Sequence, residues 1–172
     1  FVHSRDDGDR VQLVLEEELL GTGGTLRANT DFINGESILI IHADNLCLSN
    51  ISAFIDAHNN RGAGVIITMM TFFAPDPTQC GVVELDENSI VTGFHEKVEA
   101  PPTNIANAAV YIFEPTVIQD IDRNNETYLD ISLDILPKYV GRIRAWPADG
   151  FHIDIGTLQN LEKANAFMSG RF

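Results

Sequence analysis

A three-layer α/β fold, built on a mixed and mostly parallel sheet with a small β-rich insertion, is predicted by three observations. Short apolar runs alternate with segments of helical periodicity through the first 70 residues. Two of these runs, residues 37–41 and 64–70, are almost entirely apolar, which is typical of strands buried on both faces of a parallel sheet. After residue 80 the alternation gives way to paired strands, which indicates the insertion.

The elements of the first half follow from apolar patterning and from the residues that interrupt it. Glycines at 21–24 break the chain after a β-like run and acidic residues, Asn34 and Gly35 end the next helix, and Ser49 or Asn50 caps another. In order, we expect a strand at 11–15, a glycine loop at 21–25, a helix at 26–32, a strand at 37–41, a helix at 51–60 and a strand at 64–70.

The second half begins with two strand-like runs around the turn-forming cluster 86–89, which predict an antiparallel hairpin. Pro115 opens a helix, and Pro137 marks the last turn of another or a kink in it. In order, we expect strands at 81–85, 90–94 and 108–113, a short helix from 115, a helix at 130–139, short strands at 142–146 and 151–153, and a closing helix at 157–168.

Length and composition limit the class of protein. The 172 residues suggest one domain, residues 1–172, because a typical domain has about 150 residues. The net charge of −14 argues against nucleic acid and anionic membranes as partners. Cys47 and Cys80 have no metal-binding spacing and fit a reducing compartment. With no signal peptide at the start of the sequence, a cytoplasmic location is expected.

Several polar groups are candidates for chemistry. The glycine segment 21–25 lies between a strand and a helix, where backbone N–H groups could receive a phosphate or a nucleobase edge, although a turn without ligand fits equally well. The patterns His42-x-Asp44 and His152-x-Asp154 each place an imidazole and a carboxylate on one face of a strand. The two carboxylates suit Mg²⁺, whereas all four groups suit zinc or manganese.

The pair Glu96-Lys97 leaves a strand with opposite charges, one able to accept from hydroxyl groups and one able to pair with phosphate. A solvated surface pair is the alternative. Asn107 opens the next strand, as a ligand amide or as an edge cap.

Segments along nearly the whole chain resemble the sugar-1-phosphate nucleotidyltransferases, in particular the small bacterial hexose- or heptose-1-phosphate guanylyltransferase type. The family motifs are, in order, L-G-T-A-G-[AT], an apolar strand ending in N-G-D, Y-G-V-V-x-x-D, F-x-E-K-P, N-x-G-[IV]-Y, D-x-x-x-D-[IV]-[IL]-P and W-x-D-[IVT]-G-T. The matching segments of this chain are residues 19–25, 39–44, 80–86, 94–97, 107–111, 130–137 and 152–157.

The resemblance implies a nucleotide-diphospho-sugar transferase, Rossmann-like fold and the transfer of a nucleotidyl group from a nucleoside triphosphate to a sugar 1-phosphate. GTP and a manno-configured hexose or heptose are favoured. It also implies a role for each matched residue: Gly21 and Thr22 on the nucleotide side, Asp44 and Asp154 as Mg²⁺ ligands, Gly81, Glu96 and Asn107 facing the sugar, and Lys97 binding the sugar phosphate, with Asp44, Lys97 and Asp154 as the catalytic set.

The chain also departs from the family pattern. His42, Val98, Ala109 and His152 replace its usual Asn, Pro, Gly and aromatic residues, which points to altered substrate choice. The family's opening strand and triphosphate-binding loop, about sixty residues, should precede Phe1, so we expect the 172 residues alone to be inactive. Apolar sheet surface left exposed would favour a homodimer. Two alternatives stay open: a non-catalytic sugar-phosphate-binding or regulatory module, and a metal-dependent phosphohydrolase using His42, Asp44, His152 and Asp154.

Overall fold

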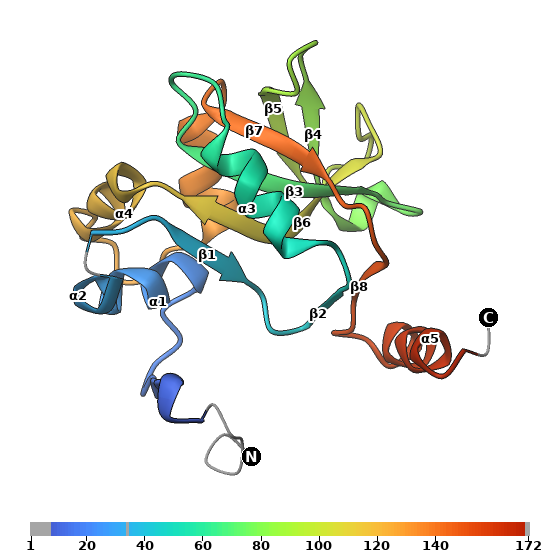
Figure 1. Cartoon of the computed structure of the whole chain (residues 1–172), viewed down its shortest axis with the longest axis horizontal. Helices are drawn as coiled ribbons and strands as arrows, with labels where there is room; N and C mark the ends of the chain where they lie inside the picture. Colours follow the sequence, from blue (N-terminus) through green and yellow to red (C-terminus); the bar gives the residue numbers. More distant parts are fainter. Residues whose placement is uncertain (1–7, 34, 171–172) are drawn as a thin grey trace.

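The computed structural model describes residues 8–33 and 35–170. A six-stranded sheet in the order β5-β4-β6-β3-β7 forms its centre, and β1 also pairs with β6 (Figure 1). Its strands are β1 (Ile38–Ile41), β3 (Ile67–Phe73), β4 (Gly81–Leu85), β5 (Val91–Glu96), β6 (Ile105–Phe113) and β7 (Ile143–Pro147). A second sheet pairs β2 (Asn45–Cys47) with β8 (His152–Asp154).

Helices α1 (Thr22–Ala28) and α2 (Thr30–Ile33) precede the first strand, α3 (Ile51–Asn59) and α4 (Pro115–Asp122) connect strands, and α5 (Leu158–Met168) follows the last strand. The expected cap of α3 is confirmed, because the side chain of Asn50 accepts a hydrogen bond from the amide of Ala53 at 3.1 Å. Thr157 caps α5 in the same way. Short 3₁₀ helices occur at Gly8–Arg10 and Pro77–Gln79.

The core has two halves, one on each face of the sheet, and this arrangement confirms the three layers. Alternate residues of β6 point to opposite faces. Val110 and Ile112 pack with Phe54 of α3 on one face. Tyr111 and Phe113 pack on the other face with α4 and the segment 129–139.

The mixed α/β sheet is confirmed, but its strands are not mostly parallel. Among the described strands of this sheet, only β3 and β7 pair in parallel, whereas the pairs β1–β6, β3–β6, β4–β5 and β4–β6 are antiparallel. The apolar runs at 37–41 and 64–70 led to the parallel prediction. Only the second run forms a strand that is buried on both faces, because Leu39 and Ile41 of β1 are exposed. A strand covered on both faces carries an apolar run whatever its direction.

Other elements differ locally from expectation. Residues 11–15 form no strand, and Leu15 is 95% exposed. The helix expected at 26–32 begins at Thr22 and is split into α1 and α2, while Asn34, its expected end, lies outside the described residues. The helix expected at 130–139 is one π-type turn, Ile131–Ile135, followed by a 3₁₀ turn, Leu136–Tyr139. Strand β2 was not expected.

The exposed apolar surface expected from the sequence lies beside β1. A groove of about 400 Å³ runs between this strand, α1, α2 and the segment around Val14, and Phe32 and Leu39 are exposed there. Dimerisation through this surface stays a prediction. Among the described helices, none combines the length and the apolar character that a membrane span requires.

Candidate active site

A polar cavity of about 330 Å³ opens where two strands share one edge of β6. Since β3 occupies the other edge, β1 pairs with the end of β6 at residues 110–113, and β4 meets its beginning at Ala106. Asn107, Ala108 and Ala109, which lie between these two pairings, form the floor of the cavity. The chain leaving β1 and the start of β4 form its sides.

Six of the eight predicted site residues line this one cavity: Asp44, Gly81, Glu96, Lys97, Asn107 and Asp154. Gly21 and Thr22 are not part of its lining. The segments that supply the six residues are separated by up to 110 positions in the chain, and the fold alone brings them together. Asn45, Asp130 and Ser132 also line the cavity, and sequence reasoning assigned them no role.

Asp44 and Asp154 lie next to each other, as predicted, but on the small sheet and not at the edge of the large one. Asp44 immediately precedes β2, and Asp154 pairs in register with Asn45. The backbone carbonyl of Asp44 accepts a hydrogen bond from the amide of Ile155 at 2.7 Å. A Cβ atom placed on Gly156 would lie 2.9 Å from Asp154 Oδ1 and 3.8 Å from Asp44 Oδ2, so both carboxylates face the same point.

Two neighbouring carboxylates suit a hard cation such as Mg²⁺, which keeps several water ligands and takes others from a substrate phosphate. No group of three or more His, Cys, Asp or Glu side chains is placed to hold a metal in the part of the chain that the structure describes. The phosphohydrolase alternative required such a group. The donor set therefore fits Mg²⁺ with two protein ligands better than zinc.

His42 and His152 both line the cavity, but they pack as aromatic rings. His152 contacts the ring of Phe72 with 4.7 Å between centroids. Burial lowers the pKa of His152, and the negative charge of Asp154 only partly offsets this. His42 Nε2 and His152 Nδ1 are buried without a hydrogen-bond partner among the described residues.

Glu96 lies directly over Gly81 of the neighbouring strand. The two residues pair in register, and a Cβ atom on Gly81 would fall onto the Glu96 carboxylate. Burial raises the pKa of Glu96, with a smaller contribution from Asp130, and Lys97 opposes the change. Gly81 is therefore the residue that leaves room for this carboxylate at the cavity wall.

Lys97 is the only cationic side chain that lines the cavity in the described structure, where Asp44, Glu96, Asp130 and Asp154 supply four carboxylates. Its Nζ lies 3.9 Å from Glu96 Oε1, and its side chain is 65% exposed. The backbone of Lys97 has φ +48°, and its amide donates to the carbonyl of Cys80 at 3.2 Å. This left-handed conformation turns the chain out of β5 at the cavity mouth.

Asn107 holds a bulge in β6. Its Oδ1 accepts from the amide of Ala109 at 3.0 Å, and its Nδ2 donates to the hydroxyl of Tyr111 at 2.7 Å. Ala109 has φ +52°, where the family motif has glycine, and its carbonyl accepts from the amide of His42 at 3.2 Å. The Asn107 amide thus keeps one N–H free for a ligand, while its other groups fix the cavity floor.

The glycine segment is packed against the chain at 128–131 and does not reach the cavity. The amides of Gly23 and Gly24 both donate to the carbonyl of Leu129, at 2.8 and 3.0 Å. A Cβ atom on Gly21 would lie 2.6 Å from that same carbonyl oxygen. These glycines permit a close approach of two chain segments, and two of the N–H groups expected to meet a ligand are already bound.

Thr22 connects this segment to the cavity indirectly, through Asp130. Its hydroxyl donates to Asp130 Oδ2 at 3.2 Å and accepts from the amide of Ile131 at 2.9 Å. The other carboxylate oxygen of Asp130 accepts from the amides of Ser132 and Leu133. Asp130 lines the cavity, so Thr22 supports one of its walls without touching it.

Comparison with known proteins identifies the family of the chain. The profile of a family described as nucleotidyl transferase matches residues 4–170. The chain belongs to this nucleotidyl transferase family. The resemblance inferred from the sequence motifs is thereby confirmed.

Two relatives illustrate the range of the family. The chain is 26% identical over 154 residues to a glucose-1-phosphate adenylyltransferase of Fervidobacterium nodosum, covering 84% of this chain and 37% of that protein. It is 27% identical over 163 residues to a mannose-1-phosphate guanylyltransferase of Mycobacterium tuberculosis, covering 92% of this chain and 44% of that protein. The chain thus spans about two fifths of the length of these relatives.

Among solved structures, HddC from Yersinia pseudotuberculosis complexed with GMP-PN has the same fold. It superposes with a TM-score of 0.77 at 23% sequence identity, over 97% of this chain and 71% of that one. The predicted nucleotide-diphospho-sugar transferase fold is therefore confirmed.

Proposed function

We propose that this chain carries the sugar-phosphate site and metal carboxylates of an enzyme that joins a nucleoside triphosphate to a sugar 1-phosphate, releasing pyrophosphate. The observation that carries the proposal is the single cavity that collects Asp44, Asp154, Glu96, Lys97 and Asn107. Relatives of the family act on sugar 1-phosphates with different bases, as their names state. Within this class we favour GTP and a manno-configured hexose or heptose.

The residues have distinct roles in this proposal. Glu96 and the free N–H of Asn107 bind sugar hydroxyl groups from the wall and floor of the cavity. Lys97 pairs with the sugar phosphate at the mouth and orients one of its oxygens for in-line attack on the α-phosphorus. Mg²⁺ held by Asp44 and Asp154 would neutralise negative charge on the phosphate oxygens. Gly21 and Thr22 stay on the nucleotide side of this arrangement.

Attack by the sugar phosphate forms a bond from one of its oxygens to the α-phosphorus and breaks the bond from the α-phosphorus to the oxygen that bridges it to the β-phosphorus, so that pyrophosphate leaves with that oxygen. None of the cavity residues has to form a covalent bond. The chemistry depends on placing two anions together, which a chain of net charge −14 does only with local cations.

The direct test is pyrophosphate release by the natural gene product that contains this chain, with GTP, UTP, dTTP or ATP against mannose-, heptose- and glucose-1-phosphate. We expect Mg²⁺-dependent release that is fastest with GTP and a manno-configured sugar. Faster release with another base or sugar would contradict the proposed substrate specificity but not the proposed reaction. Binding of sugar phosphate without any turnover would instead favour a non-catalytic module.

We further infer that the 172 residues on their own bind sugar 1-phosphate but release no pyrophosphate. A nucleoside triphosphate carries about four negative charges, and dense cationic and N–H contacts must compensate them. Arg27, the cation closest to the glycine segment in sequence, donates instead to the carbonyls of Asn124, Glu126 and Thr127. Sustained Mg²⁺-dependent release by protein confirmed by mass spectrometry to start at Phe1 would contradict this inference.

A further inference from the structure

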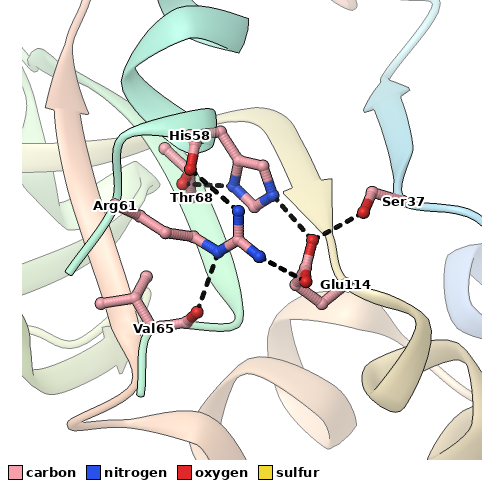
Figure 2. Close-up of polar contacts among 6 residues, drawn as sticks. All are labelled: Ser37, His58, Arg61, Val65, Thr68 and Glu114. Atoms are coloured by element: carbon pink, nitrogen blue, oxygen red, sulfur yellow. Dashed lines mark hydrogen bonds and ion pairs between the residues drawn. The ribbon is translucent and has the colours of Figure 1, made fainter. Parts of the chain in front are cut away.

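A partly buried polar network lies at the other end of the sheet from the cavity. It consists of Ser37, His58, Arg61, Thr68 and Glu114, and we call it the His58 network (Figure 2). His58 is 2% exposed and Thr68 is fully buried. Strands β3 and β6 each run from this network to the cavity, where Phe72 and Asn107 line the wall and floor.

Glu114 is the centre of the His58 network. Its Oε1 accepts from the hydroxyl of Ser37 at 2.6 Å and lies 3.0 Å from His58 Nε2, and its Oε2 pairs with the guanidinium of Arg61 (Figure 2). Although burial opposes ionisation, the hydrogen bonds from Ser37 and His58 and the charge of Arg61 outweigh it, so the pKa of Glu114 is lowered. The carboxylate is therefore an acceptor only.

This acceptor fixes the protons of the neighbouring groups. His58 Nε2 carries a hydrogen and donates it to Glu114, because an ionised carboxylate has none to give. In a neutral imidazole the other nitrogen, Nδ1, is then an acceptor, and the hydroxyl of Thr68 donates to it at 2.7 Å. Every group is satisfied only while His58 is neutral. A proton on Nδ1 would turn the Thr68 hydroxyl hydrogen away from the ring, in a fully buried position.

The His58 network links five segments of the chain. Ser37 directly precedes β1, His58 lies in the last turn of α3 and Arg61 follows the end of that helix. Thr68 belongs to β3, and Glu114 joins β6 to α4. Arg61 also donates to the carbonyls of His58 and Val65, which closes the end of α3. Strand β1 is only four residues long, and three residues beyond it lies Asp44 of the cavity. The network therefore anchors the start of the strand that delivers Asp44.

We propose that the His58 network is an acid-labile latch: protonation of His58 releases the start of β1 and the end of α3 from the sheet. The charged groups that act on His58 are Arg61 from the segment after α3 and Glu114 from the β6–α4 junction, while β3 contributes only the uncharged Thr68. The proposal concerns local opening and does not depend on the proposed function.

The direction of the pH effect follows from the shift of His58. Burial lowers the pKa of His58, Arg61 lowers it further, and the hydrogen bond to Glu114 only partly opposes this. The open state, with an ordinary pKa of about 6.5, binds a proton more readily than the closed state. The latch is therefore fully closed above pH 6.5 and weakens as the pH falls below it.

Hydrogen exchange measured by mass spectrometry at pH 7.5 and pH 5.5, corrected for intrinsic rates, tests the proposal. We expect the opening constant of peptides over residues 37–41 and 51–59 to rise up to about tenfold at the lower pH, because opening is linked to one proton. Peptides over residues 90–94, which carry no titratable side chain, serve as the internal reference. His58→Gln should remove the rise, and His95→Gln, at a hairpin histidine away from the network, should retain it.

A pH dependence that persists unchanged in His58→Gln would overturn the proposal, as would equal exchange at both pH values in the wild-type protein. If His58→Gln does not fold, the NMR titration of the His58 ring in the wild-type protein decides the question. A folded-state pKa at or above about 6.5 would remove the driving force for opening.

Discussion

Replacing Gly81 with alanine should selectively weaken sugar 1-phosphate binding. The added methyl group would fall onto the Glu96 carboxylate, with the ring of Phe94 3.0 Å away, so Glu96 has to swing out of its place at the cavity wall. Gly81 does not have a positive φ, so alanine fits its backbone conformation. The change thus acts through the displaced carboxylate.

The size of the effect follows from the contact that is lost. A hydrogen bond between a charged group and a neutral partner contributes about 1.5–3 kcal/mol. At 1.4 kcal/mol for each factor of ten, the Kd for the sugar 1-phosphate should rise about 10- to 150-fold. Overpacking itself should lower the free energy of unfolding by about 1–3 kcal/mol.

Gly93→Ala is the matched control. Gly93 faces Glu84 across the same hairpin as Gly81 faces Glu96, and a methyl group there would lie 2.9 Å from Glu84 Oε2. Neither Gly93 nor Glu84 lines the cavity. Isothermal titration calorimetry of both variants with the sugar 1-phosphate separates overpacking from ligand contact. Wild-type affinity in Gly81→Ala, or an equal loss in Gly93→Ala, would refute the placement of the sugar against Glu96.

Two further substitutions test the charged groups of the cavity. Asp44→Asn in the natural gene product should lower Mg²⁺-dependent pyrophosphate release by about 100-fold or more, because the lost charge acts mainly in the transition state. Sugar-phosphate binding should change little. Equal losses in turnover and binding would contradict the metal role. Lys97→Ala should raise the KM for sugar 1-phosphate about tenfold, as expected for one charge-assisted contact, and an unchanged KM for every sugar phosphate would exclude it as the phosphate ligand.

The main elements of the fold could be predicted because apolar patterning reflects burial. The strand at 37–41 and the hairpin were found on that basis, since their side chains alternate or are buried together. Strand direction could not be found in this way. A strand covered on both faces has the same apolar run in either direction, and β6 has to be located before its antiparallel neighbours can be assigned.

The π-type turn at Ile131–Ile135 shows a second limit. Its apolar spacing resembles a helix, but Asp130 caps it with two hydrogen bonds to the amides of Ser132 and Leu133, and Pro137 follows within two turns. Local capping and a proline set the length of this segment, and its apolar residues only set which face is buried. The strand predicted at residues 11–15 is absent because β propensity alone, without a partner strand, does not form a strand.

The meeting of the candidate residues in one cavity could be foreseen only in part. Asp44 follows β1 and Glu96 ends β5 of the large sheet, whereas Asp154 ends β8 of the small sheet and Asn107 lies at the bulge of β6, so their convergence depends on the topology of both sheets. Asp130 was missed because its carboxylate acts as a helix cap, a role that sequence reasoning assigns to most such residues. Its second contact, to Thr22, crosses 108 positions and leaves no local signal.

Thr22→Val tests whether the glycine segment contributes to nucleotide binding or only to packing. The substitution keeps the shape of the side chain but removes both hydrogen bonds of the hydroxyl, to Asp130 and from the amide of Ile131. Ile131 is buried, so its unpaired amide should lower the free energy of unfolding by about 1–3 kcal/mol in a urea titration.

If Gly21 and Thr22 lie on the nucleotide side, the same change should also weaken nucleoside triphosphate binding, measured by calorimetry on the natural gene product, and leave the sugar 1-phosphate Kd unchanged. The reason is geometric: the hydroxyl of Thr22 links the start of α1 to the Asp130 wall, and without it the segment carrying Gly21 can move relative to the cavity. Lower stability with unchanged affinity for both ligands would restrict these two residues to packing, and the nucleotide contacts would then have to come from other parts of the protein.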